Sequence, residues 1–206
     1  MCGMPSSGSS RQDLERYLAK HGVLGEEGVR VFETRDGGLE WIEDKILLAA
    51  GIVTDSNKPP LELSELSFFE EFDEAALEAI GRELEASVLE AGKGLFLRDE
   101  PGDRLYFVRR GRIRILLPLE GGKRHHLATV ASGEMFGEVA FLDGERRSAD
   151  AEAAVNTWLY VLPRAGLASL ENTHPEVAAR IFEGIAKVTS FRLRMADAEL
   201  RTLEER

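Results

Sequence analysis

Turn-forming glycines recur about every ten residues between Val88 and Leu162, and this spacing limits the available folds more than any other feature. Arg112 to Ile115 alternates polar and apolar side chains, and Val155 to Leu162 is an apolar run rich in β-branched and aromatic residues. Short strands with regular turns are typical of an antiparallel barrel or sandwich. We therefore predict an α+β fold built on an antiparallel eight-strand β-roll, jelly-roll-like, over about 88–162. The glycines stand at positions 92, 94, 102, 111, 121, 122, 133, 137 and 144.

Helical patterns flank this roll. Before it, a phenylalanine-rich stretch suggests short helices, the second of them capped by Asp73. After Pro163, apolar residues fall on one helical face, which predicts a long C-terminal helix over about 175–206. At about 1.5 Å per residue this helix would exceed 40 Å, more than a small roll needs for cover. We expect part of it to close over a ligand or to form a homodimer. Its apolar stripe comprises Val177, Ile181, Ile185, Val188 and Met195.

The first fifty residues form a separate pattern of helix, strand and helix. One strand and two helices cannot cover both faces of a sheet, so residues 1–50 amount to part of an α/β domain. The polar stretch from Gly51 to Pro60 ends in two prolines, which disfavour a helix. We therefore expect a linker over 51–62 and a second domain over 63–206.

Charge and cysteine content narrow the functional classes. The net charge is −11, and affinity for nucleic acid depends on Lys and Arg that neutralise phosphates, so we expect no nucleic-acid partner. Residues 101–150 carry 9 basic and 7 acidic side chains, however, so a small anion could bind there. Cys2 is the single cysteine, and the longest apolar run is too short to cross a membrane. These features predict a cytoplasmic location.

The segment from Gly133 to Asp150 combines the groups that a nucleotide needs. Gly137 allows close approach of the backbone, and the next residues can begin a helical turn whose N–H groups face an anion. Arg147 adds a planar, permanently charged group that suits a phosphate. The Glu138 carboxylate can accept a hydrogen bond from a ribose hydroxyl.

At these residues the chain resembles the cyclic-nucleotide-binding domain family, whose phosphate-binding cassette reads F-G-E-x-A, a short turn, then R-[STA]-A. Phe136 to Ala140 and Arg147 to Ala149 match that cassette, and Gly102 to Gly111 resembles an upstream strand of the family. The resemblance implies that Glu138 holds the ribose 2′-hydroxyl and that Arg147 holds the cyclic phosphate. It covers about 63–195 and implies one ligand-binding set: Gly137, Glu138, Val139, Ala140, Arg147, Ser148 and Ala149.

Three positions bear on the details of this site. Asp99 stands where the family often has glycine, and Asp150 replaces a small hydroxyl residue beside the cassette. Arg146 lies next to Arg147, but the spacing favours Arg147 as the residue that points inward. Ser148 is compatible with either base, and cyclic AMP is favoured over cyclic GMP as the ligand.

The first fifty residues resemble the C-terminal half of a STAS domain, as found in SulP anion transporters. The residues that carry this resemblance are Gly28 to Phe32 and Leu39 to Leu48. The resemblance implies a regulatory module in the cytoplasmic part of such a transporter, tethered to the inner face of the plasma membrane through a membrane transporter domain.

Other readings stay open. A Crp-like transcription regulator without its DNA-binding domain would share the cassette, and a degenerate cassette could have a purely structural role. A cupin-like metalloenzyme would need clustered ligands, but His125 and His126 are adjacent and would point to opposite faces of a strand. We therefore expect no metal, no catalytic residues and no enzymatic activity.

Overall fold

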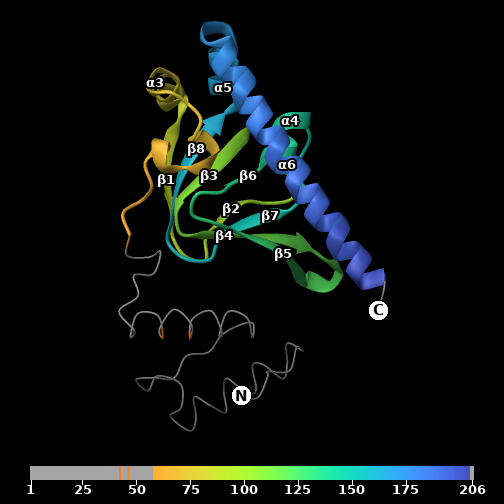
Figure 1. The fold of residues 1–206 in the computed structure, drawn as a ribbon. Helices are drawn as coiled ribbons and strands as arrows, with labels where there is room; N and C mark the ends of the chain where they lie inside the picture. The colour runs from red at the N-terminus through yellow and green to blue at the C-terminus, as the bar shows by residue number, and fades with distance from the viewer. Residues whose placement is uncertain (1–41, 43–45, 47–57, 205–206) are drawn as a thin grey trace. The chain divides into compact units, whose positions relative to one another are not determined.

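The computed structural model describes residues 42, 46 and 58–204 (Figure 1). The chain separates into two compact units, Met1–Thr54 and Asp55–Arg206. In the first unit, Ile42 and Ile46 are helical and exposed. The rest of the expected STAS-like segment and the linker as far as residue 57 lie outside the described residues. Among the residues that are described, no helix is long and apolar enough to cross a membrane.

Within residues 58–204, eight antiparallel strands form two four-stranded sheets, which confirms the β-roll expected from the turn spacing. The first sheet has the order β1-β8-β3-β6 and the second has the order β2-β7-β4-β5. The strands are β1 (Glu85–Leu89), β2 (Gly94–Phe96), β3 (Arg104–Arg110), β4 (Arg112–Pro118), β5 (Arg124–Ala131), β6 (Met135–Phe136), β7 (Asp150–Ala153) and β8 (Thr157–Pro163).

Helices precede, interrupt and follow the strands (Figure 1). The helical turn expected after Gly137 is present as α4, and the long C-terminal helix is present as α6. The elements are η2 (Leu63–Glu65), η3 (Ser67–Phe69), α3 (Glu74–Glu83), η4 (Glu120–Gly122), α4 (Glu138–Asp143), α5 (Arg164–Thr173) and α6 (Pro175–Glu204).

Strand β3 is buried on both faces. Successive side chains of a strand point in opposite directions, so neighbouring residues of β3 pack into two different clusters. Leu105 and Phe107 pack into a cluster with α3, α5 and α6. Tyr106 and Val108 pack into a second cluster, which fills the space between the two sheets. The first sheet is therefore packed on both faces. Strand β6, which leads into the cassette, belongs to this sheet and is held in place with it.

The first half of α6 belongs to the core, and its second half does not. Val177, Ile181 and Ile185 are buried, as the apolar stripe predicts. Further along, four large apolar side chains are more than half exposed: Phe191, Leu193, Met195 and Leu200. The stripe is therefore core packing up to about residue 188 and leaves apolar surface beyond it.

The N-cap of α3 gives a direct test of the local structure. Asp73 has extended backbone angles, and its carboxylate accepts a hydrogen bond of 2.8 Å from the Ala76 N–H, as expected for a cap. Asp73→Ala should lower the free energy of unfolding by about 0.5 to 2 kcal/mol in chemical denaturation. Asp73→Asn should lower it much less, since the amide oxygen still accepts the bond; equal losses in the two variants would contradict the assignment.

Candidate ligand-binding site

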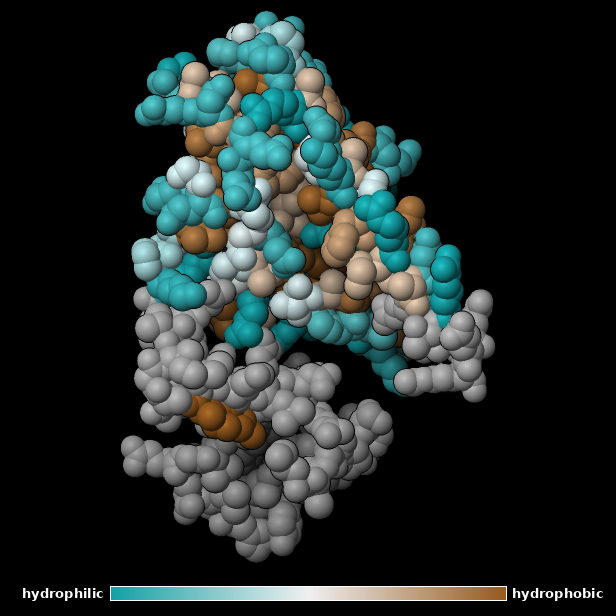
Figure 2. All heavy atoms as spheres, viewed as in Figure 1, coloured by the Kyte–Doolittle hydropathy of each residue, from teal (hydrophilic) through white to brown (hydrophobic). Residues whose placement is uncertain are grey.

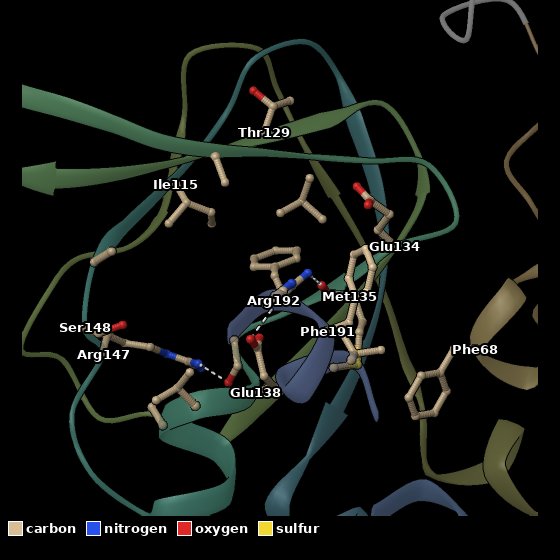
Figure 3. A pocket seen from close by; sticks show the side chains of 18 of the residues that line it. Phe68, Ile115, Thr129, Glu134, Met135, Glu138, Arg147, Ser148, Phe191 and Arg192 are labelled. Carbon is tan, nitrogen blue, oxygen red and sulfur yellow. Dashed lines mark hydrogen bonds and ion pairs between the residues drawn. The ribbon is translucent and has the colours of Figure 1, made fainter. Parts of the chain in front are cut away.

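A pocket of about 690 Å³ opens between the second sheet, the cassette and α6 (Figure 3). This volume is in the range of small-molecule sites. In Figure 2, hydrophobic residues gather on the visible face beside α6. All seven residues implied by the family resemblance line the pocket: Gly137, Glu138, Val139, Ala140, Arg147, Ser148 and Ala149.

Gly137 makes the turn from β6 into α4. Its φ of 82° lies in the left-handed region, where glycine is strongly preferred. A Cβ at this position would lie 2.8 Å from Nη1 of Arg147 and 3.2 Å from the Tyr106 ring. Both the backbone angle and the space therefore require glycine. The first N–H groups of α4 have no intrahelical acceptor and no side-chain cap at Gly137, so they can face an anion.

Arg147 is held deep in the site, at only 3% exposure. Nη1 donates to the Gly137 carbonyl at 3.0 Å, and Nη2 donates to the Arg104 carbonyl at 2.8 Å. The guanidinium also lies 4.2 Å from the centre of the Phe96 ring, which suits a cation–π contact. Its Nε is buried and has no hydrogen-bond partner among the described residues.

The charge of Arg147 is not neutralised by a neighbouring side chain. Burial lowers the pKa of its guanidinium, and the opposing effects of Tyr106 and Asp103 are smaller. Within residues 58–204, no ion pair joins Arg147 to a carboxylate. A buried, unpaired cation is unfavourable, so an anion that enters the pocket would gain a strong partner.

Glu138 is the acidic counterpart of Arg147 and is also buried, with 6% exposure. Its Oε1 accepts a hydrogen bond of 2.7 Å from Nη1 of Arg192, a residue of α6 (Figure 3). The other terminal nitrogen of Arg192 donates to the Met135 carbonyl. Arg192 is not part of the apolar stripe of α6. A polar residue outside such a stripe is expected to face solvent, so the sequence did not indicate this contact.

The three further positions that bear on the site, Asp99, Arg146 and Asp150, lie outside the pocket. Arg146 is exposed and donates to the Asp99 carbonyl at 2.6 Å. Asp99 has a φ of 67°, in the left-handed region that glycine adopts most readily. A glycine would therefore suit this position. The Asp150 carboxylate accepts a bond from the Arg98 N–H at 2.8 Å and is not among the pocket residues. Asp150 therefore does not place a carboxylate in the wall of this pocket.

The two histidines do not form a metal site in the described part of the chain. His126 lies 2.9 Å from the Thr129 hydroxyl, and both histidines are exposed on β5. No group of three His, Cys, Asp or Glu side chains that could hold a metal occurs among the described residues.

Sequence reasoning named only Phe136, in the cassette, and Val188, in the apolar stripe, among the apolar residues that complete the pocket wall, and it did not predict the others. Most of this wall is apolar and comes from strands far apart in the sequence, so that only the fold brings it together. These residues are Phe96, Ile115, Val130, Met135 and Phe136 from the roll, Phe68 from η3, and Val188 and Phe191 from α6. They provide a surface on which a flat, partly apolar group could rest.

The cassette geometry agrees with a comparison against known families. Residues 87–174 match the family model described as cyclic nucleotide-binding domain. The chain contains a cyclic nucleotide-binding domain. This domain belongs to a regulatory family rather than to a catalytic one.

Related proteins share this domain in several contexts. Glutaminase 1 of Bradyrhizobium diazoefficiens is 29% identical over 96% of this chain, which covers 31% of that protein. The cyclic AMP receptor protein of Thermus thermophilus is 38% identical over 54% of this chain and 50% of its own length. A crystal structure of the Thermus thermophilus catabolite activator protein aligns with a TM-score of 0.58 and 30% identity, covering 66% of this chain and 62% of that one. The chain thus spans half or less of these two curated relatives.

The two glycines that bound α4 provide a matched test of the turn. Gly144 also has a left-handed backbone, with φ of 73°, but a Cβ there would meet nothing within 4 Å. Gly144→Ala should lower the free energy of unfolding by about 1 to 2 kcal/mol, from backbone strain alone. Gly137→Ala should lower it by about 2 to 5 kcal/mol, because the methyl group also displaces Arg147. Similar losses in urea unfolding would show that Arg147 does not pack against this turn.

Proposed function

We propose that the cyclic nucleotide-binding domain of this chain binds a cyclic mononucleotide in the cassette pocket, with cyclic AMP preferred over cyclic GMP, and acts as a regulatory module of a longer protein. Arg147 is the observation that carries this proposal. It is buried and permanently charged, it has no carboxylate partner among the described residues, and it lies beside the N-terminus of α4. A cyclic phosphate carries one negative charge, which would pair with the Arg147 guanidinium and with the N–H groups at the start of α4.

The remaining parts of a nucleotide fit the rest of the pocket. Glu138 can accept the ribose 2′-hydroxyl, as the family resemblance implies. The backbones of Gly137, Ala140, Ser148 and Ala149 would complete the phosphate cradle. The base would rest on the apolar wall that includes Ile115 and Phe191. The similarity to a protein named cyclic AMP receptor protein supports adenine over guanine.

A separate proposal concerns the part of the longer protein whose activity this module regulates. The similarity to Glutaminase 1 extends over 96% of the chain, and so includes the segment before residue 58. This favours a regulatory region joined to an amidohydrolase that acts on glutamine. Expression of the complete coding sequence, with glutamine hydrolysis assayed with and without cyclic AMP, tests this candidate.

Two other contexts remain predictions. A SulP-type transporter would follow from the STAS-like pattern of residues 1–50, nearly all of which lie outside the described residues. A Crp-like regulator would follow from the similarity to the Thermus thermophilus protein. In that case, the exposed Phe191, Met195 and Leu200 of α6 would support a homodimer through this helix.

Calorimetric titration of the chain with cyclic AMP and cyclic GMP tests the proposed ligand, and Arg147 provides the decisive variant. Arg147→Ala should weaken binding by about 2 to 5 kcal/mol, since it leaves a desolvated phosphate without its counter-charge. That range is about thirty-fold to several-thousand-fold in Kd. Arg147→Lys should recover only part of the loss, because an ammonium keeps the charge but not the planar geometry.

Arg146→Ala is the matched control, because Arg146 is the adjacent arginine and is exposed. Its effect on Kd should stay below about five-fold, as for other exposed charges. If Arg146 proves the sensitive residue, the assignment of the phosphate site is wrong. If no cyclic nucleotide binds the wild-type chain, the cassette has a structural role alone.

A further inference from the structure

A second cavity, of about 460 Å³, shares none of its lining residues with the cassette pocket. It opens between the loop before β3, the loop after α4 and the first residue of α5. Its volume is also in the range of small-molecule sites. Four charged residues line this α5 cavity: Asp103, Glu145, Arg146 and Arg164.

Backbone contacts hold the walls of the α5 cavity in place. A β-bridge joins the two loops. Gly102 is packed so closely that a Cβ there would lie 2.1 Å from the Ala140 Cβ and 3.0 Å from the Glu145 carbonyl oxygen. The Arg164 N–H donates to the Asp103 carbonyl at 2.8 Å, which ties the start of α5 to the first loop. The cavity is therefore a feature of the packed fold.

The two guanidinium groups of the α5 cavity are held by carbonyls and not by carboxylates. Nη1 of Arg146 donates to the Asp99 carbonyl at 2.6 Å, and Nη2 of Arg164 donates to the Phe141 carbonyl. A guanidinium has five N–H donors. Within residues 58–204, each of these side chains makes that one hydrogen bond and no ion pair. Both arginines therefore keep donors for a ligand.

Two carboxylates face the same cavity. Asp103 and Glu145 are exposed, and neither carboxylate forms a hydrogen bond or an ion pair with another described residue. Positive and negative side chains thus line one small cavity without pairing with each other. Each of the four charges is left to solvent or to a ligand.

This mixture of charges selects a class of ligand. A simple anion would be repelled by the carboxylates, and a simple cation would be repelled by the arginines. A molecule that carries both charges can satisfy both sets. Its carboxylate accepts hydrogen bonds from a planar guanidinium, and its ammonium group donates to the carboxylates. An α-amino acid has both groups on one carbon.

We propose that the α5 cavity binds a free α-amino acid, with its carboxylate on Arg164 and Arg146 and its ammonium group on Asp103 and Glu145. Arg164 is half-buried whereas Arg146 is exposed, so Arg164 contributes more to the affinity. We expect a Kd on the order of 1 mM, because exposed ion pairs contribute little. This second site goes beyond the proposed function and does not rest on it.

The test follows backbone amide signals by nuclear magnetic resonance while the chain is titrated with glutamine, the probe chosen because of the similarity to Glutaminase 1. Gly102 and Gly144 report on the α5 cavity, and Gly137 reports on the cassette pocket. Glutamine should shift the first two signals to saturation and leave the third unchanged. N-acetylglutamine lacks the ammonium group and glutamine α-amide lacks the carboxylate, so each should bind at least about three-fold more weakly.

Two variants and a control assign the contacts. Arg164→Gln should weaken glutamine binding by about ten-fold or more, as for hydrogen bonds between charged groups. Arg146→Ala removes an exposed side chain, so it tests the same site without disturbing the core, and it should weaken binding by about three-fold. Arg82→Gln should leave the Kd unchanged, because Arg82 is an exposed arginine of α3 outside the cavity.

Several outcomes would overturn the inference. These are the absence of saturating shifts at Gly102 and Gly144 up to about 50 mM glutamine, equal binding of N-acetylglutamine, and wild-type affinity in both Arg164→Gln and Arg146→Ala. Shifts at Gly137 that cyclic AMP reverses would place the amino acid in the cassette pocket and overturn it as well. Failure of cyclic AMP to bind, with glutamine still shifting Gly102 and Gly144, would contradict the proposed function alone.

Discussion

The burial of Arg147 without a carboxylate partner is the interaction around which the described site is organised. Two backbone carbonyls and an aromatic ring surround the guanidinium, and these groups offset only part of the unfavourable burial of a charge. The left-handed turn at Gly137 provides one of the carbonyls and leaves room for Nη1. A fold that holds a cation in this way is prepared for an anion, and the helical N–H groups of α4 add to the same preference.

The rest of the domain keeps this arrangement rigid. β3 carries Arg104 and Tyr106 to the site and is buried against helices on one face and against the second sheet on the other. β6 pairs with β3 directly before the Gly137 turn. The cassette and the β-roll are therefore packed together, and α6 contacts the cassette through Arg192.

The sequence predicted most of the fold because the signals for it are local. Glycines at the turns, alternation in Arg112 to Ile115 and the cap at Asp73 each depend on neighbouring residues, and the structure contains the features they predict. The cassette residues were predicted by family resemblance, and the structure places them around one pocket. Arg192 and the apolar wall could not be predicted in this way, because their roles depend on contacts between distant segments. The nature of residues 1–50 is a prediction that the described residues do not test.

The central claim is that the Arg147 guanidinium is the anchor for a cyclic phosphate. A crystal structure of the chain grown with cyclic AMP measures this directly. The account predicts that the cyclic phosphate lies within hydrogen-bond distance of Arg147 and of the backbone N–H groups at the start of α4, with the ribose 2′-hydroxyl on Glu138. A nucleotide bound elsewhere, or a phosphate held by Arg146 while Arg147 keeps only its contacts to the Gly137 and Arg104 carbonyls, would contradict it.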